Sequence, residues 1–209
     1  MRKIVFFIFN LLIVISISAQ NLNKTVNINS FVSNSFININ NIQTVIYNDG
    51  YTNINSFIFP KYTKNPLITA GGFLFGVKFK NEIYPRVGGS YYLTGLQPGI
   101  INTNGTASDP NLSKYRVYKV RPDIYVGGPF VDLSDEAKLN YVEIASLRSQ
   151  YEKDWVEWPA DLGAPFKDVN NNGIYEPSID IPGVPGAAQT LWYVANDLDS
   201  KINKTIIRR

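Results

Sequence analysis

Short segments in which apolar and polar residues alternate run through much of the chain, separated by Gly, Pro, Asn and Asp. Between Phe73 and Lys80, an aromatic or aliphatic residue occupies every second position. This period of two is typical of a strand with one solvent-facing side. Similar runs occupy Thr44–Tyr47 and Tyr115–Val120, and Asp49-Gly50 is a hairpin signal. The sequence therefore predicts a mainly β protein with a β-sandwich-like sheet, complete or incomplete.

One segment has the period of a helix instead. From Ser134 to Trp158 the apolar residues recur three or four positions apart, at Ala137, Tyr141, Ile144, Leu147, Tyr151, Trp155 and Trp158. This spacing predicts one long amphipathic helix, with Ser134 as its N-cap and Pro159 just beyond its end. The fold class is then α+β, with the apolar face of the helix packed on the sheet.

The chain divides by composition into six parts: a signal peptide at 1–19, an Asn-rich leader at 20–40, a β-rich region at 41–130, the helix at 131–160, a calcium-type loop with a buried strand at 161–200, and an atypical tail at 201–209. The leader fits either a disordered tract or half-buried strands. The strand at Thr190–Ala195 is apolar on both faces, which places it inside a larger sheet.

The N-terminal segment has the pattern of a secretory signal. Arg2 and Lys3 precede an apolar run over residues 4–17, and Ser18-Ala19-Gln20 supplies small residues for cleavage after Ala19. The run is shorter than the roughly 20 residues that a membrane-spanning helix needs, and no second run of that length follows. We therefore expect export to the periplasm, cell surface or medium, and no transmembrane span after signal removal.

Composition excludes several kinds of chemistry. The chain has no cysteine and no histidine. Catalysis by Ser-His-Asp or Cys-His groups, His-ligated zinc and stabilisation by disulfides are therefore excluded. Removal of Arg2 and Lys3 lowers the basic count from 20 to 18 against 17 acids, a net charge of +1. This balance gives no reason to expect a nucleic acid or an anionic membrane as partner.

One segment carries a specific metal-binding pattern, that of an EF-hand-type calcium loop beginning at Asp168. The expected oxygen donors are Asp168, Asn170, Asn172, the Ile174 carbonyl, Glu176 and Asp180. Gly173 stands at loop position 6, where the chain bends sharply, but Ile179 occupies position 12 in place of the usual glutamate. Closure falls to Glu176 or Asp180, so we expect a weak structural Ca²⁺ site with a dissociation constant of about 0.1 to 1 mM. The alternative is a plain Asn-Gly turn.

Two other groups of residues suggest binding or catalysis. Trp155 and Trp158 could form a platform for sugar rings, although their helical phase favours core packing. Acids around the same helix end are candidates for a glycosidase pair: Glu143, Asp154, Glu157 and Asp161. The basic aromatic strip at Lys114–Arg121 places its cations on both strand faces, which favours two solvated edges over one binding surface.

Several stretches resemble a known family: Gly88-Gly89-Ser90, residues 95–99, residues 116–123, residues 158–165, the loop at 168–177, and the run at 182–197. They are similar to large secreted proteins of the Bacteroidetes and Ignavibacteria that carry a type IX secretion sorting domain, over roughly residues 71–199. The resemblance implies export, surface attachment or release, and a calcium-type loop at Asp168, Asn170 and Asn172. The family has no activity that carries over. Its members continue into a β-rich sorting domain, so the tail at 201–209 suggests a truncated or frameshifted reading frame.

The sequence thus predicts a secreted, non-catalytic surface, matrix or adhesion module with a weak structural calcium loop. Its partner is an unknown surface or extracellular molecule, for which a polysaccharide is one candidate. Two alternatives stay open. One is a secreted carbohydrate-binding module or a fragment of a carboxylate-dependent glycoside hydrolase, and the other is a truncated, non-functional remnant.

Overall fold

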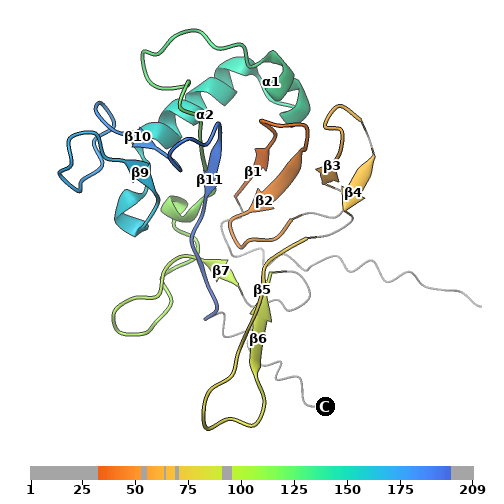
Figure 1. The fold of residues 1–209 in the computed structure, drawn as a ribbon, viewed down its shortest axis with the longest axis vertical. Helices are drawn as coiled ribbons and strands as arrows, with labels where there is room; N and C mark the ends of the chain where they lie inside the picture. Colours follow the sequence, from red (N-terminus) through yellow and green to blue (C-terminus); the bar gives the residue numbers. More distant parts are fainter. Residues whose placement is uncertain (1–32, 53–55, 64, 69–70, 91–95, 199–209) are drawn as a thin grey trace, which may run out of the picture.

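The computed structural model describes residues 33–52, 56–63, 65–68, 71–90 and 96–198 (Figure 1). The predicted signal peptide at 1–19 and tail at 201–209 lie outside the described residues, as do the first part of the Asn-rich leader and the run Tyr91–Leu93.

Most strands of the described chain precede the two α-helices, and the remaining strands follow them. Two α-helices, α1 (Ser134–Asn140) and α2 (Ile144–Val156), are accompanied by two short 3-10 helices, η1 (Ser113–Tyr115) and η2 (Ala160–Leu162). The strands are β1 (Asn34–Ile37), β2 (Thr44–Tyr47), β3 (Phe57–Ile58), β4 (Pro66–Ile68), β5 (Leu74–Val77), β6 (Arg86–Gly89), β7 (Gln97–Pro98), β8 (Tyr118–Val120), β9 (Phe166–Lys167), β10 (Ile181–Pro182), β11 (Thr190–Trp192) and β12 (Ala195–Asn196).

These strands form small antiparallel pairs. Within the described residues there are six two-stranded sheets, of which β7–β12 and β8–β11 join segments far apart in the sequence. A β-rich α+β fold is therefore confirmed, whereas the β-sandwich is not. The larger sheet predicted around Thr190–Ala195 is also not found there, because β11 is half-buried and pairs with β8 alone.

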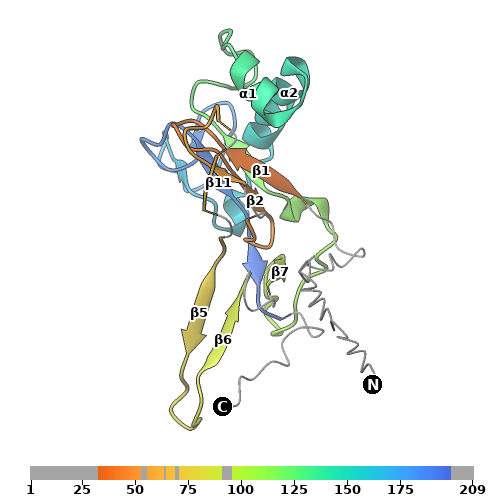
Figure 2. The ribbon, with the colours of Figure 1, turned by 90° about the vertical axis from the view of Figure 1, so that its right-hand side faces the viewer.

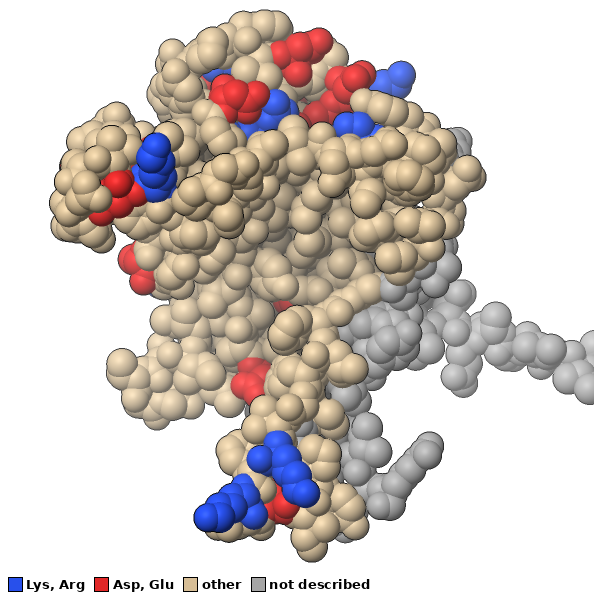
Figure 3. Space-filling view, in the orientation of Figure 1, with Lys and Arg blue, Asp and Glu red and all other residues tan. Residues whose placement is uncertain are grey.

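The helices and one hairpin lie at opposite ends of the molecule. Figures 1 and 2 show α1 and α2 together at one end, while the β5–β6 hairpin projects from the other. On the face seen in Figure 3, charged side chains gather over the helical end and at the end of this hairpin. The strand predicted over residues 73–80 is shorter than expected, since regular pairing stops at Val77.

The prediction of one helix over Ser134–Trp158 is wrong, because the chain turns between α1 and α2. Tyr141 adopts a left-handed conformation (φ 56°), and the N–H of Val142 donates to the Ala137 carbonyl at 3.0 Å. This is the hydrogen bond of a Schellman-type helix end. Ser134 is not the N-cap either; its own N–H donates to Asp132 Oδ1 at 2.9 Å. Both helices keep the same apolar spacing, which conceals the break in the sequence.

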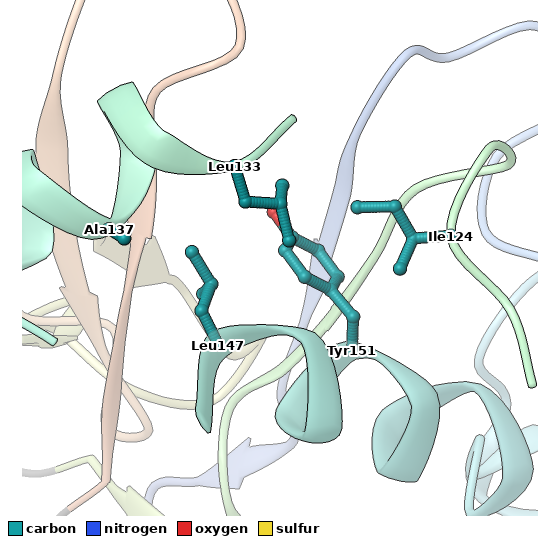
Figure 4. Packing of buried hydrophobic residues seen from close by; sticks show 5 residues of the cluster. All are labelled: Ile124, Leu133, Ala137, Leu147 and Tyr151. Atoms are coloured by element: carbon teal, nitrogen blue, oxygen red, sulfur yellow. The ribbon is translucent and has the colours of Figure 1, made fainter. Parts of the chain in front are cut away.

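Within the described residues, two clusters of buried hydrophobic side chains lie beside α2 and the segment that follows it. The first joins both helices to the loop after β8 through Ile124, Leu133, Ala137, Leu147 and Tyr151 (Figure 4). The second joins β8 to the segment after α2 through Tyr118, Val120, Trp158 and Ala164. The Trp158 ring meets Tyr118 edge-on, with ring centres 6.2 Å apart. The two clusters fix the end of α2 and the loop that follows it.

Candidate calcium loop

The Asp168 segment forms the loop of a β-hairpin. Strands β9 and β10 pair antiparallel on either side of it, with Lys167 opposite Ile181. The base of the loop is therefore fixed at both ends, which lowers the entropy lost when its side chains converge.

Asp168 organises the turn at the end of the loop. Its carboxylate accepts the N–H of Asn172 at 3.2 Å through Oδ1 and the N–H of Gly173 at 2.7 Å through Oδ2. Gly173 has a φ of +76° and Asn171 a φ of 58°, both in the left-handed region. Glycine carries no penalty in that region, and asparagine tolerates it better than most residues. The predicted role of Gly173 as the sharp bend is confirmed.

Three of the expected donors converge on one point. Glu176 Oε2 accepts hydrogen bonds from the side-chain amides of Asn170 and Asn172, each at 2.7 Å. Asn172 Oδ1 in turn accepts the N–H of Ile174 at 2.8 Å. In this arrangement amide N–H groups, with their partial positive charge, stand beside the carboxylate where a cation would lie.

Asp180 lies beneath the loop rather than at its rim. It is 1% exposed, and its two oxygens accept the N–H groups of Val169 and Glu176, each at 2.8 Å. A carboxylate has about four acceptor positions, so these two bonds leave capacity for a further partner. Asp180, one of the two residues expected to close the loop, thus joins the backbone at Val169 to the backbone at Glu176.

The donor set fits a hard cation only if the asparagines take part. Among the described residues, Asp and Glu side chains do not come together in a group of three that could hold a metal. Carboxylate, amide and backbone oxygens are what Ca²⁺ prefers. Rotation of the Asn170 amide would direct its oxygen toward Glu176, whereas the same rotation of Asn172 breaks its bond with Ile174. The residues therefore fit a weak site.

The loop is attached to the end of α2. Trp155 Nε1 donates to the Pro177 carbonyl at 2.9 Å, and the Tyr175 hydroxyl donates to the Trp155 carbonyl at 2.6 Å. Burial, together with the charge of Asp180, raises the pKa of Tyr175, so its hydroxyl stays protonated and able to donate. A change in the order of the loop would therefore alter the environment of the Trp155 indole.

A buried ionic cluster, which the sequence did not predict, connects β8 to both helices. Glu136 accepts hydrogen bonds from the Lys119 ammonium and from the Tyr151 hydroxyl, the latter at 2.7 Å, and it also pairs with Arg121 at 3.4 Å. Burial lowers the pKa of Lys119, which Glu136 opposes, and burial raises the pKa of Tyr151. Gln189 completes the cluster through a 3.1 Å bond to the Tyr151 hydroxyl.

The basic strip at Lys114–Arg121 is not a pair of solvated edges. Lys119 is buried against Glu136, and Arg116 pairs with Asp154 at 2.9 Å. The Arg116 guanidinium also stacks on the Tyr118 ring at 3.8 Å from its centre. Lys119 and Arg116 thus each pair with an acid on α1 or α2, while Lys114 is exposed.

The tryptophans and acids of the proposed sugar site are mostly engaged elsewhere. Trp155 and Trp158 are both buried, which confirms their role in the core and removes the exposed rings that a platform requires. Asp154 is buried, and it shares the Arg116 guanidinium with Glu157. Glu143 and Asp161 are exposed.

Comparison with protein-family models, with curated proteins and with solved structures finds no significant match to this chain. None of the helices in the described part of the chain is both long and apolar enough to cross a bilayer.

Proposed function

We propose that this protein is an exported, non-catalytic surface, matrix or adhesion module in which the loop from Asp168 to Asp180 binds Ca²⁺ as a structural ion. The observation that carries the proposal is the convergence of Asn170 and Asn172 on Glu176 within a turn organised by Asp168. The N-terminal segment and the resemblance to secreted proteins support export. The partner is an extracellular or surface molecule, for which a polysaccharide is one candidate.

The proposed ion would replace the amide N–H groups that now face Glu176. Asp168, Asn170 and Asn172 would supply side-chain oxygens, Ile174 its carbonyl, and Glu176 or Asp180 the closing carboxylate. Calcium would hold the loop against β9 and β10 and, through Trp155, against α2. Its role would be to order this end of the module rather than to catalyse a reaction.

Calcium should raise the melting temperature of the protein. At free calcium ten times the dissociation constant, the stabilisation is about 1.4 kcal/mol, or roughly 3 to 5 °C for a domain of this size. Differential scanning calorimetry with about 10 mM calcium, compared with chelator, measures this increment. In Asp168→Asn the increment should disappear, since the first ligand loses its charge.

The matched control is Asp161→Asn, which changes an exposed acid outside the loop. It should keep the whole calcium increment. Equal melting temperatures with calcium and with chelator, in protein that is folded, would remove the metal from the proposal. Using the increment rather than the absolute melting temperature cancels the stability that Asp168→Asn loses through weaker hydrogen bonds.

Export is tested separately from calcium binding. Cleavage after Ala19 leaves Gln20 as the first residue of the mature chain. Mass spectrometry of protein recovered outside the cytoplasm of the producing cell should find this N-terminus. A cytosolic product that still begins at Met1 would contradict the proposed location.

A carbohydrate-active site has less support. Its proposed platform is buried, and two of its four candidate acids are engaged with Arg116. No observation among the described residues favours it over the calcium-dependent module.

A further inference from the structure

The β5–β6 hairpin extends away from the body of the protein. Figures 1 and 2, at right angles to each other, both show it projecting from the end opposite the helices. Leu74 pairs with Gly89 and Val77 with Arg86, and the strands join through a turn in which the Glu82 N–H donates to the Phe79 carbonyl at 3.1 Å. The end of the hairpin is therefore closed by a hydrogen-bonded turn.

This hairpin exposes large apolar side chains over its whole length. Ile83, in the turn, is 83% exposed, and Tyr84 beside it is 50% exposed. Near the base, Phe73 and Leu74 are also more than half exposed. Consecutive strand residues face opposite sides of a sheet, so apolar surface lies on both faces of the hairpin as well as at its end.

Basic residues accompany this apolar surface. Residues 73–89 contain Lys78, Lys80 and Arg86 against one acid, Glu82. Lys78 and Lys80 are exposed. Figure 3 shows basic side chains gathered at the end of the hairpin. The hairpin therefore carries a local positive charge that the near-neutral chain as a whole does not show.

An anionic lipid bilayer matches this combination better than a protein partner does. A protein docked on one face would leave the apolar side chains of the other face in water. A bilayer instead surrounds an inserted hairpin end, places aromatic and aliphatic side chains at the acyl boundary, and lets lysine stems reach the phosphates. Each basic residue near an anionic surface adds to the attraction.

We propose that the end of the β5–β6 hairpin inserts into the interface of an anionic lipid bilayer. Ile83 and Tyr84 enter the acyl boundary, while Lys78 and Lys80 contact lipid phosphates. The binding is peripheral and does not depend on the calcium loop.

The absence of cysteine makes a site-specific test direct. Ile83→Cys in the chain that begins at Gln20, without the apolar signal segment, is labelled with an environment-sensitive NBD dye and mixed with vesicles of phosphatidylcholine and phosphatidylglycerol in equal amounts. The emission of the dye at position 83 should shift to the blue and increase about twofold or more in intensity as the dye leaves water. Nitroxide-bearing lipids should quench this emission. Phe130→Cys, at a position 85% exposed on the body, is the matched control and should not respond.

A second experiment tests whether Lys78 and Lys80 contact the lipid phosphates. Adding Lys78→Glu and Lys80→Glu to the labelled chain should weaken its binding to these vesicles by about tenfold or more. High salt should do the same, and vesicles of phosphatidylcholine alone should give a much smaller response. Melting curves of the labelled variants should match the wild type, because the changed side chains lie in water.

Three results would overturn the proposal. The first is that the dye at position 83 does not respond to anionic vesicles. The second is that the dyes at positions 83 and 130 respond equally, which would indicate adsorption through another part of the chain. A blue shift at position 83 that grows with protein concentration in the absence of vesicles would instead assign the surface to a second copy of the chain.

Discussion

Glu136→Gln should destabilise the protein by about 3 to 5 kcal/mol. The substitution leaves the Lys119 ammonium buried and without its carboxylate, and Asn38 Oδ1, at 3.4 Å, remains as a neutral acceptor. It also weakens the bond from the Tyr151 hydroxyl. Urea or thermal unfolding followed by circular dichroism measures the loss, which corresponds to a fall in melting temperature of about 6 to 20 °C.

Two comparisons separate the buried charge from a general loss of packing. Glu152→Gln, which removes a partly exposed partner of Arg148, should cost less than about 1 kcal/mol. The double variant Lys119→Met with Glu136→Leu removes both buried charges and should be more stable than Glu136→Gln alone. If the free energy of unfolding of Glu136→Gln lay within about 1 kcal/mol of the wild-type value, the cluster would be hydrated and not a buried ion pair.

Trp158→Ala should lower the free energy of unfolding by about 3 to 5 kcal/mol. The ring is 4% exposed, lies against Tyr118, and donates from Nε1 to the Pro165 carbonyl at 2.9 Å. Removing it leaves a cavity in the second core cluster and takes away one of the two hydrogen bonds of the Pro165 carbonyl, which still accepts the Gly183 N–H at 2.9 Å. Denaturant unfolding measures the free-energy change.

Phe130→Ala is the control for Trp158→Ala, because it removes a ring that is almost entirely in water. Its effect should stay within about 0.5 kcal/mol. The pair also distinguishes core packing from a sugar platform. If Trp158→Ala abolished binding to a polysaccharide while the stability remained that of the wild type, the ring would belong to a binding surface.

The local sequence pattern predicted which segments form strands better than it predicted how those strands pair. Thr44–Tyr47 is a strand as predicted, and both tryptophans are buried as predicted, although Trp158 lies beyond the end of α2. Strand partners could not be predicted, because pairing β8 with β11 depends on contacts between segments about 70 residues apart in the chain. The alternation that defines a strand carries no information about which strand lies beside it.

The helix break and the ionic cluster were missed for specific reasons. Tyr141 continues the apolar spacing but is 94% exposed, so its position marks the turn and not the core. Nothing in its residue type indicates a left-handed conformation. Lys119 and Glu136 are ordinary surface residues by composition, and their burial follows only from the packing of α1 against β8.

The backbone geometry of the candidate calcium loop was the most predictable part of the candidate site. The spacing from Asp168 to Glu176 placed the bend at Gly173 and brought Asn170, Asn172 and Glu176 together. It did not show that Asp180 would lie buried beneath the loop, bonded to two backbone N–H groups. That position depends on the pairing of β9 with β10, which the spacing of the ligands does not encode.

Calcium binding to the loop is measured most directly by terbium luminescence excited through Tyr175 and Trp155, with calcium as competitor. We expect sensitised emission from the wild type, displacement by calcium with a dissociation constant of about 0.1 to 1 mM, and loss of the emission in Asp168→Asn but not in Asp161→Asn. Absence of sensitised emission from folded wild-type protein, or equal emission from Asp168→Asn, would contradict this expectation.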